Sequence, residues 1–310
     1  MIALIPSRMK QATVIVPATT ANLGAGFDCI GAALTLYNQF TFTTVETNTD
    51  LKIVVTGEAA ARVSQERDNL LYQSFTKFYQ KIDRSIPKIE VEIKLGVPLA
   101  RGLGSSATAI VGGLVGANQL AGNPLSTTEV MELAIEMEGH PDNVVPALLG
   151  NCQLSVGETG NWQICEIPWH QEIVPVVAIP DFELSTEEAR SVLPTTISRS
   201  DAIFNISRLG LLLRGLETNR SDWLSTALAD KLHQPYRQSL IHGYQQVQSA
   251  AIASGAYGMV ISGAGPTLLA LTNPQQAKNV VRAMMEAWGE QGINPKVMIL
   301  QLDTTGAKVI

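Results

Sequence analysis

Alternating apolar and polar residues in the first part of the chain predict β-strands, and apolar residues spaced three or four apart predict helices. The clearest strand is residues 89–95, where Ile, Val, Ile and Leu alternate with charged residues. The stretch 68–82 is typical of a helix, with Asp68 as its expected N-cap. This part of the chain is expected to form strands at residues 13–16, 40–45, 51–56 and 89–95, and helices at residues 68–82, 105–120 and 128–138.

The rest of the chain continues both patterns. We expect strands at residues 152–156, 162–167, 174–179, 258–261, 267–271 and 296–302, and helices at residues 197–216, 222–229, 240–253 and 275–290. Runs of strands and runs of helices favour an α+β fold, with antiparallel sheets and helices on one face. Because 310 residues is long for one hydrophobic core, we expect two packed halves with a boundary near residues 168–175.

Composition narrows the class of protein. Hydrophobic residues make up 45% of the chain and charged residues 16%, which excludes a disordered chain. The formal net charge is -6, and no cluster of Lys and Arg occurs, so we expect no nucleic-acid partner. The three cysteines, Cys29, Cys152 and Cys165, are an odd number and form no CxxC pair. They indicate a reducing compartment, and we expect a cytoplasmic protein.

Two long stretches, residues 102–128 and 238–277, contain no Asp, Glu, Lys or Arg. Their glycines, prolines and amide side chains are unlike those of a membrane span, so we expect no membrane partner. At the N-terminus the basic residues follow the short apolar run. That order does not predict a signal peptide.

A glycine-rich segment, PLARGLGSSAT at residues 98–108, lies between a predicted strand and a predicted helix. Its glycines, Gly102 and Gly104, allow the backbone to approach a ligand closely. The first N–H groups of a helix lack partners within it and carry partial positive charge. No Asp or Glu occurs between this segment and Glu129, and Arg101 adds a cation. The segment is therefore a candidate phosphate-binding loop.

The same segment has other interpretations. It fits an ordinary helix that Ser105 or Ser106 caps. It also fits the G-x-G-x-x-A pattern, but no acidic residue follows about 20 positions later, where a dinucleotide site needs one. No Lys follows the glycines, so the segment is not a Walker loop.

Two further segments of small residues follow predicted strands. The segment 17–28 reads PATTANLGAGFD and gathers hydroxyl, amide and carboxylate side chains around two glycines. The segment 261–267 reads ISGAGPT and lies between two apolar strands. Each alone is typical of a turn or a hairpin. Three such segments together predict one shared site.

In this order, the three segments resemble the three motifs of the GHMP kinases, the small-molecule kinases named after galactose, homoserine, mevalonate and phosphomevalonate. The central segment is similar to that family's phosphate loop. Longer segments resemble the homoserine branch of the family: PATTANLGAGFDCIG from residue 17, EGHPDNVVPALLG from residue 138, STEEARSVLP from residue 185 and DKLHQPYR from residue 230. The resemblance runs from near residue 17 to near residue 271.

The resemblance implies a two-domain α+β fold. Residues 1–170 would form an ATP-binding domain like ribosomal protein S5 domain 2, and residues 171–310 a ferredoxin-like α+β domain. The site would lie in the cleft between them. The implied reaction is direct in-line phosphoryl transfer from ATP to L-homoserine with Mg²⁺, giving ADP and O-phospho-L-homoserine for threonine biosynthesis.

The resemblance also implies which residues bind ATP. The glycine-rich segment would bind the phosphates, and Asn69 is a candidate for contact with adenine, although its position also suits the first turn of a helix. The implied ATP-binding residues are Asn69, Pro98, Leu99, Ala100, Arg101, Gly102, Leu103, Gly104, Ser105, Ser106, Ala107 and Thr108.

A zwitterionic substrate such as L-homoserine requires an anion for its ammonium and a cation for its carboxylate. Asp28 has the first charge, and Arg190 and Arg237 have the second, since a guanidinium binds a carboxylate through two parallel hydrogen bonds. Asn22 and Asn143 carry amides that can orient the ammonium and the reacting hydroxyl. The resemblance places all five around the substrate. By residue type alone, both arginines would be ordinary surface cations.

Glu132 points away from the apolar stripe of its predicted helix, a position typical of an exposed side chain. Glu136 and His140 follow at four-residue intervals, which suggests a metal cluster as an alternative, but Mg²⁺ prefers oxygen ligands. The resemblance selects Glu132, and leaves Glu136 and His140 as surface or supporting residues. The implied metal ligands are Ser105, Ser106 and Glu132, and the implied catalytic residues are Asn22, Asn143 and Glu132.

Three matters stay open in the sequence. Asp142 lies where some relatives have a general base, and we assign no base. We expect a homodimer. The alternatives to phosphorylation of L-homoserine are another kinase of the same family, with mevalonate or a sugar as acceptor, and a non-catalytic ligand-binding regulator with the same fold.

Overall fold

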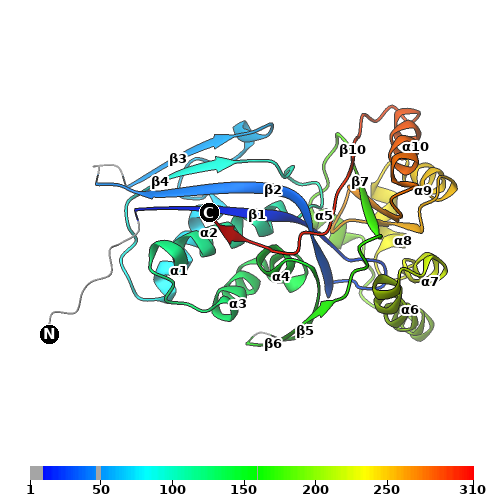
Figure 1. Cartoon of the computed structure of the whole chain (residues 1–310), viewed down its shortest axis with the longest axis horizontal. Coiled ribbons are helices and arrows are strands. Elements are labelled where there is room, and N and C mark those ends of the chain that lie inside the picture. The colour runs from blue at the N-terminus through cyan, green and yellow to red at the C-terminus, as the bar shows by residue number, and fades with distance from the viewer. Residues whose placement is uncertain (1–9, 47–49, 159) are drawn as a thin grey trace.

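The computed structural model describes residues 10–46, 50–158 and 160–310. These residues form a seven-stranded sheet and a four-stranded sheet, with helices packed against both (Figure 1). The expected α+β class is confirmed. The expectation about a signal peptide concerns residues 1–9, which lie outside the described residues.

The first sheet has the strand order β11-β1-β2-β4-β3, and β5 pairs with β2 and β6. Its pairs are antiparallel except β3 with β4, which is parallel. The expectation of antiparallel sheets is wrong at this pair, because the connection from β3 to β4 contains helix α1 (Leu70–Lys81) and so can cross back over the sheet. The strands are β1 (Gln11–Ala21), β2 (Ile30–Thr44), β3 (Leu51–Thr56), β4 (Ile89–Lys94), β5 (Cys152–Glu158), β6 (Asn161–Ile167) and β11 (Lys308–Val309).

Helices α1 to α4 pack against one face of the first sheet (Figure 1). Phe40 of β2 and Phe75 of α1 are fully buried there. Helix α2 approaches both elements closely: a Cβ at Gly112 would lie 2.4 Å from the Phe40 ring, and one at Gly113 would lie 2.4 Å from the Leu71 carbonyl oxygen. The helices are α1 (Leu70–Lys81), α2 (Ser105–Leu120), α3 (Thr127–Glu138) and α4 (Pro141–Leu149).

The second sheet has the strand order β10-β7-β9-β8 and is antiparallel throughout. Val176 and Ala178 of β7 pack with α9 and α10, whereas Val177 and Ile179 face the core that contains α6 and α7. Helices therefore cover both faces of this sheet, where the expected one-face arrangement is wrong. The elements are β7 (Val174–Ile179), β8 (Gly258–Ile261), β9 (Leu268–Thr272), β10 (Lys296–Ile299), α6 (Arg199–Thr218), α7 (Ser221–Ala227), α9 (Tyr244–Ala253) and α10 (Ala277–Gly289).

One apolar core joins the two sheets. Ala18 of β1 and Ile30 of β2 share it with Leu212 of α6 and Leu269 of β9. The chain passes from the first sheet to the second between β6 and β7, and its last described strand, β11, pairs with β1. The division into residues 1–170 and 171–310 stays a prediction.

Local boundaries differ from the expected ones. Strand β1 continues to Ala21, so only the second half of the segment 17–28 is a loop. The N-cap of α1 is Asn69 rather than Asp68, because the Asn69 Oδ1 atom accepts the N–H groups of the first helical turn at 3.0 and 3.3 Å. Short elements without a long apolar repeat were not expected from the sequence. They include α5 (Thr186–Ser191), α8 (Gln234–Arg237), η1 (Ala60–Arg62) and η2 (Gln238–Leu240).

None of the described helices combines the length and the apolar composition needed to cross a membrane. The longest, α6, has 20 residues and carries charged residues along its length.

Replacing Gly113 by alanine is expected to destabilise the fold by roughly 1–3 kcal/mol, because the new Cβ would overlap the Leu71 carbonyl oxygen. Gly210 of α6 is the matched control, since nothing lies within 4 Å of a Cβ built there. Gly210→Ala is expected to stabilise the chain by about 0.5–1 kcal/mol. Urea unfolding of both variants measures these changes, and equal effects would contradict the close contact between α1 and α2.

Candidate active site

The three glycine-containing segments meet between the two sheets, as expected. The N–H of Gly263, in the β8–β9 hairpin, donates to the Ala21 carbonyl at the end of β1 (2.9 Å). In the same hairpin, Ser262 Oγ bonds the Gly102 carbonyl (2.7 Å) and the Thr20 hydroxyl (2.9 Å). Segments far apart in the sequence are thus joined directly.

A cavity of about 370 Å³ lies where these segments meet. Most of the predicted site residues line it: Asn22, Asp28, Ala100, Arg101, Gly102, Gly104, Ser105, Ser106, Asn143, Arg190 and Arg237. Others do not: Asn69, Pro98, Leu99, Leu103, Ala107, Thr108 and Glu132. The cavity also includes Glu138, His140 and Asp142, to which the sequence analysis gave no ligand role.

The start of α2 is suited to an anion. Gly104 is the N-cap in a left-handed conformation (φ 66°), no side chain caps the helix, and its first turn has no acidic residue. The first helical N–H groups therefore remain available, with the partial positive charge of a helix start. Only glycine fits at this cap, because a Cβ at Gly104 would lie 2.0 Å from Thr19 Oγ1.

Arg101 connects the glycine-rich segment to the chain that follows β7. Its Nε and Nη2 atoms donate to the carbonyls of Pro180 and Asp181, both at 3.1 Å. Its Nη1 atom forms an ion pair with Glu183 (2.8 Å), and Arg62 of η1 binds the same carboxylate. The Arg101 cation is therefore largely engaged within the protein.

Glu132 does not line the cavity, and its expected role as a metal ligand stays a prediction. Its side chain is on the exposed face of α3, whereas Glu138, the last residue of that helix, lines the cavity. Ser106 Oγ donates to Glu138 Oε2 at 2.8 Å. The two glutamates are six positions apart, so at about 100° per residue they point about 120° apart around the helix.

The oxygen atoms near Glu138 are suited to Mg²⁺. The Ser106 hydroxyl contacts the Glu138 carboxylate, and Ser105 lines the same cavity. Mg²⁺ prefers such ligands and keeps several waters or phosphate oxygens. Among the described residues, no group of three or more His, Cys, Asp or Glu side chains could hold a metal by itself. Burial raises the pKa of the Glu138 carboxyl, and the hydrogen bond from Ser106 opposes this.

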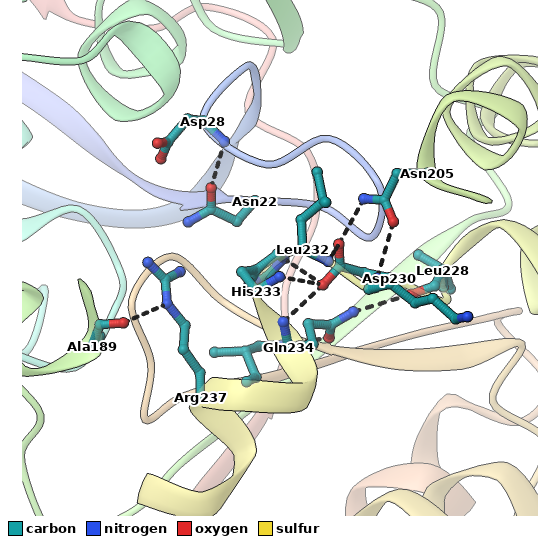
Figure 2. Close-up of polar contacts among 12 residues, drawn as sticks. Asn22, Asp28, Ala189, Asn205, Leu228, Asp230, Leu232, His233, Gln234 and Arg237 are labelled. Carbon is teal, nitrogen blue, oxygen red and sulfur yellow. Dashed lines mark hydrogen bonds and ion pairs between the residues drawn. The ribbon is translucent and has the colours of Figure 1, made fainter. Parts of the chain in front are cut away.

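The two predicted amides have different surroundings. Thr19 Oγ1 donates to Asn143 Oδ1 (2.8 Å), which fixes the Asn143 amide at the cavity wall. Asn22 uses both ends of its amide within the protein: Nδ2 donates to the Gly263 carbonyl (2.9 Å), and Oδ1 accepts the Asp28 N–H (2.8 Å; Figure 2). Asn22 therefore holds the loop that presents Asp28.

His140 and Asp142 form a close pair. The His140 Nδ1 and Asp142 Oδ1 atoms are 2.6 Å apart, and the Asp142 side chain is buried. The hydrogen bond and the charge of Asp142 raise the pKa of His140 above its usual value, although burial opposes the shift. His140 was expected at the surface or in a supporting role, but it lines the cavity. Glu136 is exposed and pairs with Lys77.

Asp28 and Arg190 form a bidentate ion pair, with distances of 3.0 and 3.1 Å. Asp28 is the last residue of the segment 17–28 and Arg190 lies on α5, so the pair joins the two halves of the chain. Both side chains are partly exposed and line the cavity. The carboxylate and guanidinium expected to bind opposite ends of a zwitterion are thus neighbours.

Arg237 is fully buried, unlike most arginines. Nε donates to the Ala189 carbonyl and Nη1 to the Gly263 carbonyl, both at 3.1 Å, and the guanidinium lies 5.1 Å from the centre of the Phe27 ring. Burial lowers the pKa of Arg237 to about 10. The group therefore keeps its charge at neutral pH.

Asn69 has a local structural role. Besides capping α1, it donates from Nδ2 to the Ser64 carbonyl at 2.6 Å. The predicted contact with adenine stays a prediction.

Comparison with known proteins agrees with this site. Residues 69–151 match the GHMP kinases N terminal domain, and residues 209–291 match the GHMP kinases C terminal domain. The homoserine kinase of Crocosphaera subtropica is 68% identical, over 97% of this chain and 98% of its own. That of Trichormus variabilis is 65% identical, over 97% and 99%.

A solved structure is also similar. The crystal structure of homoserine kinase from Cytophaga hutchinsonii has 29% sequence identity and a TM-score of 0.89, and the match covers 98% of each chain. The same family is indicated by both domain matches, by the near full-length relatives and by the similar fold. The chain belongs to the GHMP kinase family, among the homoserine kinases.

Proposed function

We propose that the chain transfers the γ-phosphoryl group of ATP to the side-chain hydroxyl of L-homoserine, giving ADP and O-phospho-L-homoserine. The observation that carries this proposal is one cavity that combines an uncapped helix start with a carboxylate, two guanidinium groups and an amide. The first feature suits a triphosphate, and the second suits a small zwitterion. The relatives' names support the same substrate.

The charged side chains would recognise both ends of the amino acid. Asp28 would bind the ammonium, while Arg190 and Arg237 would bind the carboxylate. Arg237 donates from Nε and Nη1 to the protein, and its Nη2 has no hydrogen-bond partner among the described residues. The planar guanidinium therefore has an edge available for a carboxylate.

The rest of the cavity would position the transferring group. The N–H groups at the start of α2 would stabilise charge on the phosphate oxygens, and Asn143 would orient the attacking hydroxyl. Positioning and charge stabilisation are the main demands of phosphoryl transfer, so direct in-line attack needs no covalent intermediate. Mg²⁺ with ATP would neutralise phosphate charge, held by Glu138 and by Ser106 or Ser105.

We also propose a cytoplasmic location and a homodimer for this protein. The state of the cysteines supports the location, because Cys29, Cys152 and Cys165 are free thiols.

An ADP-release assay with L-homoserine, L-serine and mevalonate tests the proposed reaction. We expect turnover with L-homoserine and much less with L-serine, whose hydroxyl is one methylene closer to the charged groups. Turnover of mevalonate but not L-homoserine would make the proposed substrate wrong. ATP binding without turnover of any acceptor would favour a regulator.

The two glutamates of α3 give a matched pair of variants. Glu138→Gln is expected to lower kcat/KM for ATP by at least about tenfold, since even indirect partners of a metal contribute 10- to 100-fold. Glu132→Gln tests the role expected for Glu132, and it should behave like the native chain if Glu138 holds the metal, because Glu132 lies on the exposed face. Initial rates over a range of Mg²⁺ concentrations check this, and added Mg²⁺ should partly restore only Glu138→Gln. Equal losses in both variants would contradict the assignment.

The Asp142→Asn variant tests whether the reaction needs a base. If Asp142 is not the base, the maximal rate of Asp142→Asn is expected to fall by less than about 100-fold. Removal of a general base costs at least about 100-fold. Because Asp142 raises the pKa of His140, its loss should move any step due to His140 in the pH profile to lower pH. The dependence of kcat/KM on pH, measured for the native chain and for Asp142→Asn, checks this. A larger loss that persists at every pH would make Asp142 the base.

A further inference from the structure

Arg237 is carried by α8, a helix of a single turn. A single turn is unstable in isolation, because ordering its residues costs more than one hydrogen bond returns. Nevertheless the Arg237 side chain is buried and directed at two specific carbonyls. Its placement therefore depends on the groups that stabilise α8 from outside.

Asp230 provides this stabilisation (Figure 2). Its buried carboxylate accepts four hydrogen bonds. Oδ1 accepts from Asn205 Nδ2 (2.7 Å) and the Leu232 N–H (2.9 Å), and Oδ2 accepts from the N–H groups of His233 (2.9 Å) and Gln234 (2.7 Å). Three of these donors are consecutive backbone groups that lead into α8. One side chain thus fixes the entry to the helix.

Two contacts transmit this order to Arg237. The His233 carbonyl accepts the Arg237 N–H at 3.0 Å. The His233 ring also stacks on Phe27, with centroids 4.9 Å apart, and Phe27 faces the Arg237 guanidinium. Burial lowers the pKa of His233 to about 4, so this ring is neutral at physiological pH.

Asn205 anchors Asp230 to helix α6. The Asn205 side chain is buried, and its Oδ1 atom accepts the Lys231 N–H at 2.9 Å. On the exposed side of the same turn, the Lys231 ammonium pairs with Asp201 at 3.1 Å. The segment that leads into α8 is therefore attached to α6 by a buried contact through Asn205 and by an exposed contact through Lys231.

We infer that Asp230, oriented by Asn205, is a positioning residue that sets the Arg237 guanidinium for the carboxylate of the amino-acid substrate. The inference rests on the proposed function. The four donors require a carboxylate, because each oxygen accepts two hydrogen bonds. An amide in its place would turn an NH₂ group toward two N–H donors.

Steady-state kinetics of Asp230→Asn, Arg237→Ala and the double variant test this role. Each single variant is expected to raise KM for L-homoserine about 10- to 100-fold and to leave KM for ATP within about twofold. The double variant should be no worse than Arg237→Ala alone, because Asp230 acts through Arg237. Lys231→Ala is the matched control and should resemble the native chain, because it removes the exposed pair with Asp201 and a cation–π contact with Phe204 but leaves all four hydrogen bonds to Asp230.

A second acceptor, 3-aminopropan-1-ol, separates this role from general damage to the fold. It is homoserine without the carboxylate, so Arg237 has nothing to bind. The preference for homoserine is the ratio of kcat/KM for homoserine to kcat/KM for 3-aminopropan-1-ol. This ratio should be lower in Asp230→Asn than in the native chain, by the same factor by which KM for homoserine rises. An unchanged ratio would overturn the positioning role.

Two further results would also overturn it: effects of the two substitutions that multiply in the double variant, or an equal rise in KM for ATP. If Asp230→Asn does not fold, Asn205→Ala leaves Asp230 three of its four hydrogen bonds and should change the same ratio in the same direction. Failure of the native chain to phosphorylate homoserine would remove the proposed function and this inference together. Native turnover with an unchanged KM in Asp230→Asn would overturn the positioning role alone.

Discussion

The close approach of backbone segments at the start of α2 is the constraint on which the rest of this structure depends. A Cβ at Gly102 would lie 2.2 Å from the Ser262 carbonyl oxygen, and one at Gly104 would overlap Thr19. Side chains at either position would push apart the strand end, the helix start and the β8–β9 hairpin. The same contact therefore sets the position of the amides at the start of α2, the orientation of Asn143 and the contact between the two sheets.

Much of this organisation follows from the sequence, because it is encoded locally. Helix α2 begins at Ser105 as expected, since a glycine-rich loop precedes a long apolar stripe. The convergence of the three small-residue segments also follows, because each leaves a strand and offers little steric hindrance. The parallel β3–β4 pair and the double coverage of the second sheet depend on contacts between distant segments, which periodicity does not encode.

The differences between the expected site and the observed geometry have equally specific causes. Helical periodicity placed Glu132 on an exposed face, and the structure confirms that face. The resemblance selected Glu132, whereas the glutamate of the same helix that lines the cavity is Glu138. Arg237 could not be recognised as buried from its residue type, because most arginines are exposed. Its burial depends on Asp230 and Phe27, which lie 7 and 210 positions away in the sequence.

The ion pair between Asp28 and Arg190 affects how selective the cavity is. A zwitterion that enters between these groups exchanges one internal pair for two new ones, so its net gain is a small difference between similar energies. A ligand with a single charge would leave one partner unmatched beside the remaining charges. In the proposed function, the pair would therefore discriminate against ligands with a single charge, at the expense of tight binding.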